Sequence, residues 1–138
     1  MAPGIGGRGE YFGIDVPFMR YIGLEAVSID TDACLTRLPL RPENTNSRGV
    51  VHGGVLMSVL DFTLSAAARS HAPLEFSAVT IDLTTHFLGE AKTELAVEGR
   101  CIRRGGTIVF CEGEVRDRDG QVLTIARGAF KLLDIPRR

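Results

Sequence analysis

The residues best suited to chemistry lie in one stretch of the chain, between Asn46 and Ser70. A loop with one Asn and one His ends in Gly53 and Gly54, and an apolar segment that holds a single carboxylate, Asp61, follows directly. If that segment is a helix, its first backbone N–H groups are unshielded, and they carry a partial positive charge. Such an end can stabilise an oxyanion, while the carboxylate can act as a base or a nucleophile.

The segment from Val55 to Ser70 predicts a helix that is buried on most sides, because apolar residues occupy most of its positions. The remaining polar and small positions recur every three or four residues, which places them on one face. They are Gly54, Ser58, Asp61, Ser65 and Arg69. A solvated stripe is one interpretation and a functional face is the other. Most of the stripe is small and uncharged, unlike ordinary water-facing helix positions, and this favours a functional face.

Taken singly, the two glycines also suit a tight turn, and His52 also suits a structural role. The combination Asn46-x-x-Gly49-x-x-His52-Gly53-Gly54, with Asp61 seven residues later, resembles the signature of hotdog-fold acyl-CoA thioesterases. The nearest branch is that of the PaaI-like enzymes of phenylacetate pathways. The similarity covers nearly the whole chain, including residues 17–24, 78–88 and 103–110.

This resemblance implies a role for each matching residue. Asp61 is the general base or nucleophile, and the Gly53 N–H, with Asn46 beside it, polarises the thioester carbonyl. His52 orients the loop or Asn46. Thr80 helps to place the attacking water, although by itself it is an ordinary β-branched strand residue.

The resemblance also implies contacts with the substrate, for which no further cofactor and no metal is expected. The residues expected to bind it are Gly54, Met57, Arg103, Arg104, Gly105 and Gly106. The two arginines are expected to meet the phosphates of CoA, and a solvated basic hairpin is the alternative. Apolar residues near the site, Met57, Leu60 and Phe87, suit an aryl or a medium-chain aliphatic acyl group equally.

Two departures from the family pattern concern the acyl pocket or its rim. His86 stands where Tyr or Phe is common, and Gly89-Glu90 replaces a turn that usually contains proline. The identity of the acyl group therefore stays open. Two other functions stay open as well: an acyl-CoA sensor without catalysis, which has little need of Asp61, and a hotdog enoyl-CoA hydratase, which normally has its His on the central helix.

Length and composition exclude several classes of protein. The 138 residues fit one domain, with residues 1–12 as a flexible arm, and the formal charge of −1 predicts neither nucleic-acid nor electrostatic membrane binding. No apolar run approaches the roughly 20 residues that span a bilayer, and the first residues lack a secretory signal. Cys34, Cys101 and Cys111 show no paired spacing, so we expect free thiols and a cytoplasmic protein.

The pattern of elements predicts an α+β fold. A short helix at residues 17–21 precedes strands at 24–29 and 33–40, and four hairpin-connected strands follow the central helix. The alternation of Val79, Ile81, Leu83 and Phe87 with polar residues predicts one apolar face in the first of these four. Small residues in the last strand are expected to let the helix lie close to the sheet. With the resemblance, the fold is a hotdog: a long helix wrapped by a curved antiparallel sheet.

Helix geometry predicts that the active unit contains two chains. If continuous helix joins Gly53 and Asp61, the two residues lie about 12 Å apart along its axis. Reacting groups must come within roughly 3–3.5 Å of each other, so one thioester carbon cannot contact both in a single chain. A two-fold homodimer with antiparallel central helices supplies the missing half, and the resemblance further implies a homotetramer made of two such dimers.

Overall fold

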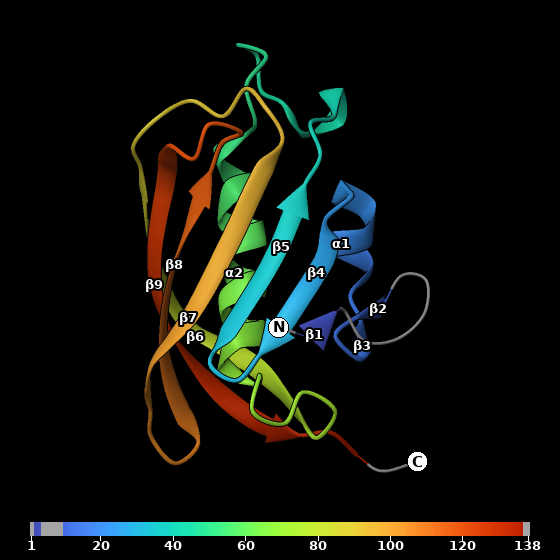
Figure 1. Ribbon diagram of the computed structural model, residues 1–138, viewed down its shortest axis with the longest axis vertical. Helices are drawn as coiled ribbons and strands as arrows, with labels where there is room; N and C mark the ends of the chain where they lie inside the picture. Colours follow the sequence, from blue (N-terminus) through green and yellow to red (C-terminus); the bar gives the residue numbers. More distant parts are fainter. Residues whose placement is uncertain (1, 4–9, 137–138) are drawn as a thin grey trace.

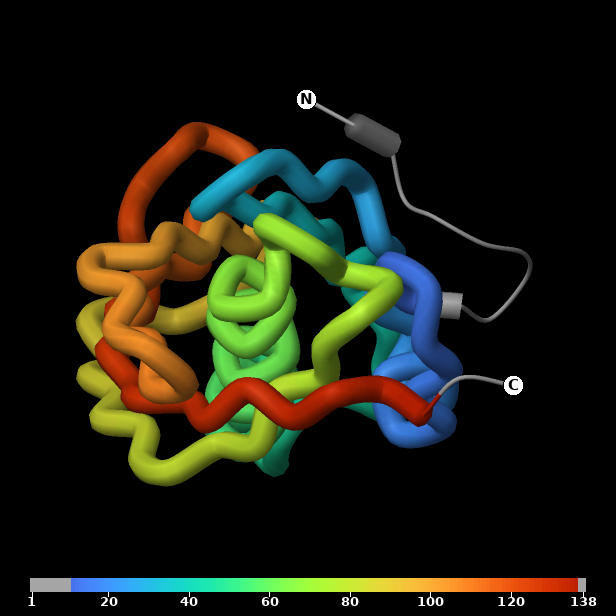
Figure 2. Tube along the Cα trace, turned by 90° about the horizontal axis from the view of Figure 1, so that it is seen from below, coloured from blue at the N-terminus to red at the C-terminus, as the bar shows by residue number. Residues whose placement is uncertain are grey.

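A continuous helix, α2 (Gly53–Ala68), runs along the concave side of a curved antiparallel sheet (Figure 1). The computed structural model describes residues 2–3 and 10–136. Seen from below in Figure 2, the sheet wraps around the helix on several sides. Within the described residues the sheet has seven strands, in the order β1-β4-β5-β7-β8-β9-β6. The predicted α+β hotdog fold is therefore confirmed.

The elements follow the predicted sequence pattern closely. The strands are β1 (Ala2–Pro3), β2 (Glu10–Tyr11), β3 (Ile14–Asp15), β4 (Glu25–Asp30), β5 (Ala33–Leu38), β6 (Phe76–Phe87), β7 (Leu95–Arg104), β8 (Ile108–Arg116) and β9 (Val122–Asp134). The short helices are α1 (Pro17–Ile22) and η1 (Pro42–Asn44). Proline begins α1, and Gly23, at φ 83°, ends it in the left-handed conformation that glycine adopts without strain.

The prediction of four hairpin-connected strands after α2 is wrong for the first connection. The turns that follow Arg104 and Arg116 do form hairpins, β7–β8 and β8–β9. Strand β6, however, pairs with β9 at one end of the sheet. Strand β7 already pairs with β5 on one side and β8 on the other, which leaves no free edge for β6.

A β-bulge between Thr80 and Asp82 overturns the predicted alternation of β6. A bulge inserts one residue and so reverses which side chains face the core beyond it. Before the bulge, Thr80 points at α2; after it, Phe87 does, while Thr84 and His86 line the outer face. Val79, which precedes the bulge and alternates with Thr80, is 49% exposed, and Ile81, within the bulge, is 54% exposed.

Two paired glycines let α2 approach the sheet. Gly99 on β7 and Gly113 on β8 lie directly opposite each other. A Cβ at Gly99 would lie 2.9 Å from the Thr63 carbonyl oxygen, and one at Gly113 would lie 2.6 Å from Leu64 Cδ1. Of the small residues of β9 that were expected to play this part, Gly128 does not, because its nearest neighbours belong to β6 and β9.

The predicted flexible arm at residues 1–12 lies partly outside the described residues. At its end the expectation is wrong, because Tyr11 and Phe12 are buried core residues. Both rings pack on Phe62 of α2, with centroids at 5.3 and 6.2 Å. This segment is thus tied down by its own aromatic side chains.

The glycine contact gives a stability prediction. Gly113→Ala should lower the free energy of unfolding by about 3 kcal/mol, because the added methyl would clash with the Glu98 carbonyl oxygen and would lie 2.6 Å from Leu64 Cδ1. The matched control is Gly106→Ala, whose Cβ would meet nothing within 4 Å and should change stability by less than about 1 kcal/mol. Urea unfolding of both variants measures the difference, and equal midpoints would contradict the close packing.

Candidate active site

The N-terminus of α2 presents a free backbone donor, at the position that the sequence predicted. His52 is the N-cap residue, and its Nδ1 accepts a hydrogen bond from the Gly54 N–H at 2.8 Å. The backbone N–H of His52 donates to the Asn44 carbonyl at 2.8 Å, which fixes the cap in place. The Gly53 N–H has no acceptor among the described residues. It is therefore available to a ligand oxygen.

The loop before the cap is shaped from within by Asn46. Its Oδ1 accepts hydrogen bonds from the backbone N–H groups of Arg48, at 2.9 Å, and Val50, at 3.4 Å. Gly49 turns the chain at φ 75°. The Asn46 side chain thus stabilises the loop, and the His52 side chain caps the helix that follows it.

Asp61 and Thr80 meet across the gap between α2 and β6. The Thr80 hydroxyl donates to Asp61 Oδ1 at 2.5 Å. Asp61 is half-buried, and Thr80 is exposed in the single chain. The bulge after Thr80 supplies this contact, because unbroken alternation would put Thr80 on the same face as Thr84 and His86.

A cavity of about 300 Å³ opens beside Asp61. Its lining comes from α2, α1, the start of β6 and the segment around β3. The lining residues are Ile14, Val16, Phe18, Met19, Ser58, Asp61, Phe62, Ser65, Arg69, Ser77, Ala78 and Thr80. Four members of the predicted polar stripe line this cavity, and Arg69 is only 2% exposed, which favours a functional face over a solvated stripe.

Sequence reasoning missed the apolar wall of this cavity. Val16, Phe18 and Met19 come from the α1 region, more than forty residues before Asp61, and no local pattern links the two segments. Of the apolar residues predicted at the site, Leu60 is fully buried in the core. Met57 is 40% exposed on the helix.

The predicted oxyanion donor and Asp61 lie on one unbroken helix, as expected. Their separation along the axis is therefore about 12 Å. The ring of Phe87 covers the first turn, because a Cβ at Gly53 would lie 3.5 Å from two of its carbons. A single chain holds the two predicted chemical groups apart.

The basic hairpin lies at the other end of α2. Arg104 donates from Nη1 to the Ala68 carbonyl at 2.6 Å and from Nη2 to Asp32 Oδ1 at 2.7 Å. The guanidinium thus satisfies a carbonyl at the helix C-terminus. Arg103 and Gly106 beside it are exposed, and Gly105 is half-buried.

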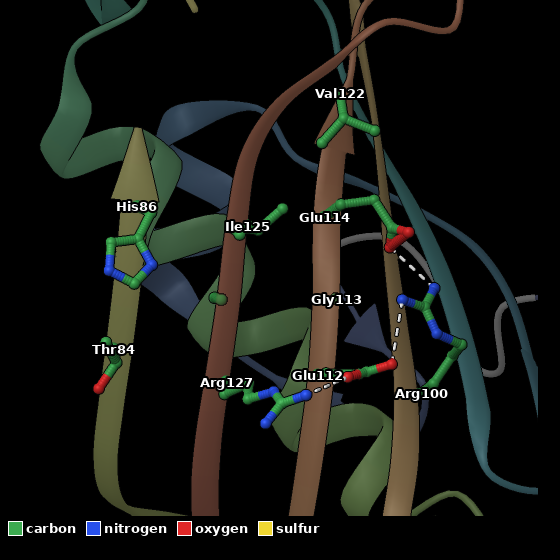
Figure 3. A pocket seen from close by; sticks show the side chains of 10 residues that line it. Thr84, His86, Arg100, Glu112, Gly113, Glu114, Val122, Ile125 and Arg127 are labelled. Atoms are coloured by element: carbon green, nitrogen blue, oxygen red, sulfur yellow. Dashed lines mark hydrogen bonds and ion pairs between the residues drawn. The ribbon is translucent and has the colours of Figure 1, made fainter. Parts of the chain in front are cut away.

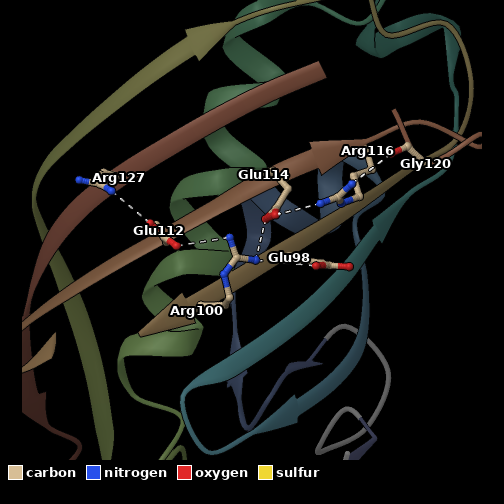
Figure 4. Close-up of polar contacts among 7 residues, drawn as sticks. All are labelled: Glu98, Arg100, Glu112, Glu114, Arg116, Gly120 and Arg127. Carbon is tan, nitrogen blue, oxygen red and sulfur yellow. Dashed lines mark hydrogen bonds and ion pairs between the residues drawn. The ribbon is translucent and has the colours of Figure 1, made fainter. Parts of the chain in front are cut away.

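A larger groove, of about 610 Å³, lies on the outer face of the sheet, away from Asp61 (Figure 3). His86 lines this groove and not the cavity beside Asp61, because the β6 bulge turns its side chain to the outer face. The charges there are paired with one another, as Figure 4 shows: Arg100 binds Glu114 at 2.8 Å and Glu112 at 3.6 Å. The groove has none of the residues predicted for catalysis.

The thiols are poor candidates for nucleophiles. All three cysteines are free, as predicted. Burial raises the pKa of both Cys34 and Cys111 to about 12, and it also raises the pKa of Cys101. Thiolate is the reactive form, so these groups are protonated near neutral pH. The described residues contain no cluster of three metal-ligating side chains.

The fold and this site define a hotdog-fold hydrolase of activated esters, and comparisons with known proteins agree. Residues 48–124 match the family model of the thioesterase superfamily. A protein of Saccharolobus solfataricus, provisionally named an esterase, is 29% identical over 115 residues, covering 83% of this chain and 81% of that protein.

Solved structures with the same fold include a conserved protein from Pseudomonas aeruginosa, with a TM-score of 0.80 and 28% identity over 86% of this chain and 94% of the other. PaaI from the phenylacetic acid degradation operon of E. coli has a TM-score of 0.78 at 18% identity, over 86% and 85% of the two chains. The chain belongs to the thioesterase superfamily, and it is a hydrolase that acts on thioester bonds. No helix in the described residues is long and apolar enough to cross a membrane.

The Thr80 contact gives a prediction for a positioning residue. Thr80→Val keeps the shape of the side chain but removes the hydroxyl, and it should lower kcat for thioester hydrolysis about tenfold or more. Thr80→Ser keeps the donor to Asp61 and should restore most of the rate. A merely structural role would make both variants alike, so equal kcat values would contradict the assignment.

Proposed function

We propose that the protein hydrolyses an aryl- or medium-chain acyl-CoA to the free acid and CoA. The observation that carries this proposal is the carboxylate of Asp61, held by Thr80 at the edge of a cavity with a largely apolar wall. A thioester carbonyl is electrophilic, so one base or nucleophile and one oxyanion donor suffice for its hydrolysis.

The proposed chemistry assigns one task to each group. Asp61 takes a proton from the attacking water or attacks the carbonyl carbon itself. The Thr80 hydroxyl donates to Oδ1, which leaves Oδ2 to face the reacting group, and the Thr80 oxygen can still accept from a water. The Gly53 N–H stabilises the oxyanion, with the macrodipole of α2 behind it. His52 and Asn46 keep this donor oriented.

The separation of Gly53 and Asp61 supports a site shared by two chains. Antiparallel packing of two α2 helices would bring Asp61 of one chain beside the partner subunit's Gly53. Strand β6 suits such a contact, since one of its edges pairs with β9 and its Val79, Ile81 and Phe87 are about half exposed. An unpaired apolar edge strand favours pairing with a second copy. We therefore propose a homodimer, and from the family resemblance a homotetramer of two dimers.

The same arrangement supports a role for the basic hairpin. In antiparallel packing, the C-terminal end of α2 points toward the partner's loop that precedes the cap. Arg103, which is exposed, would then be free to meet a phosphate of the bound CoA, near the Gly105-Gly106 turn. Arg104 would hold the hairpin in place through Ala68 and Asp32. Met57 and Gly54 lie on the exposed face of the helix and would contact the substrate there.

The first test is activity. The wild-type protein should release free thiol from acyl-CoA, and Asp61→Asn should lower kcat by roughly a hundredfold or more. Asn has the same shape but is not a base, so the fold should be retained, which circular dichroism checks. Near wild-type turnover in Asp61→Asn would remove Asp61 from the mechanism. Binding of acyl-CoA without thiol release by the wild type would favour a sensor.

The second test addresses the shared site. Asp61→Ala and Asn46→Ala, each inactive alone, are mixed and allowed to exchange subunits. A mixed dimer regains one intact site, so roughly a quarter of wild-type activity should return with random pairing. Mixing either variant with itself is the control. Proven subunit exchange without recovery would mean that each chain builds its site alone.

A further inference from the structure

We propose that Arg69 forms a carboxylate-binding end of the acyl cavity, so that the preferred substrates are acyl-CoAs whose acyl chain itself ends in a carboxylate. This inference rests on the proposed thioesterase function. Arg69 lines the same cavity as Asp61 and lies eight residues further along the same helix face. The cavity is thus lined both by the candidate catalytic carboxylate of Asp61 and by the guanidinium of Arg69.

Arg69 is a buried cation without a carboxylate partner among the described residues. Its side chain is 2% exposed, and its hydrogen bonds go to neutral backbone carbonyls. Nη1 donates to Phe12 at 3.0 Å and to Pro73 at 2.6 Å, and Nη2 donates to Tyr11 at 2.8 Å. A guanidinium has five N–H donors, so two are left over.

The charge of Arg69 persists in this surrounding. Burial lowers its pKa to about 10, which still leaves the guanidinium protonated at neutral pH. Three carbonyls fix its position but bring no negative charge. An isolated buried cation is costly, and a carboxylate that reaches it would form charge-assisted hydrogen bonds in a site with little competing water. The cavity therefore favours an anionic end over a neutral one.

The walls of the cavity suit such a chain along its length. Ile14, Val16 and Phe18 supply apolar surface for methylene groups. Ser65 lies one helical turn before Arg69, and its hydroxyl already donates to the Phe62 carbonyl at 2.9 Å, so the acyl chain does not need it. Eight helical residues correspond to about 12 Å along the axis, so the terminal carboxylate belongs on a medium-length chain and not on a short one.

The competing interpretation is that Arg69 only clamps the N-terminal hairpin. Phe12 has φ 56°, a strained value for a bulky residue, and its carbonyl is one of the three acceptors. Substitution of Arg69 would break this clamp and confuse the two roles. The test therefore leaves Arg69 intact and changes Ser65, one helical turn before it.

Ser65→Asp places a carboxylate at the i, i+4 position to Arg69, where it can neutralise the guanidinium from within the cavity. Ser65→Asn is the matched control, because Asn has the same shape as Asp but carries no charge. Thiol release is measured for adipoyl-CoA against hexanoyl-CoA and for suberoyl-CoA against octanoyl-CoA. The wild type and Ser65→Asn should prefer the carboxylate-ended member in kcat/KM by about tenfold or more, and Ser65→Asp should lose this preference.

A binding measurement separates this inference from the proposed function. Adipate should raise the Tm of the wild type and of Ser65→Asn more than hexanoate does, and Ser65→Asp should abolish the difference. Hydrolysis of the neutral thioesters without a preference in either pair would overturn the carboxylate subsite while the thioesterase assignment stands. If no thioester is hydrolysed, the proposed function fails, and the Tm shifts alone then decide for or against the subsite.

Discussion

The packing of α2 against the glycine pair of β7 and β8 is the contact on which the rest of the structure depends. Gly99 and Gly113 lie opposite each other, and no side chain separates them from Thr63 and Leu64 of the helix. This close approach fixes the position of the helix against the sheet. Because α2 is continuous from Gly53 to Ala68, fixing its middle also fixes both ends: the free donor at the N-terminus and the basic hairpin at the C-terminus.

Strand β6 completes the candidate active site beside this helix. Its bulge lets one strand serve both faces, with Thr80 and Phe87 toward the helix and His86 toward the outer groove. The strand also carries exposed apolar side chains. The bulge thus turns Thr80 toward Asp61, while the strand order leaves β6 at the end of the sheet, where a second copy can pair with it.

Charged side chains have a different part on each side of the sheet. On the outer face, arginines and glutamates satisfy one another, as in the pairs of Arg100 with Glu112 and Glu114. Inside the cavity, Arg69 has only neutral carbonyl partners among the described residues. We propose that this charge, which the protein itself does not neutralise, recognises a ligand of opposite charge, whereas the neutralised network on the outer face stabilises the sheet.

The sequence by itself determined the local features: the helix from the glycines onward, the polar stripe, the turns after Arg104 and Arg116, and the free thiols. These follow from spacing, capping and turn chemistry within a few residues. Only the tertiary structure decided that β6 pairs with β9, that Thr80 meets Asp61, that His86 faces away, and that residues around α1 complete the cavity. Strand order and bulges depend on contacts between segments far apart in the chain. The periodicity of residues within one segment cannot predict such contacts.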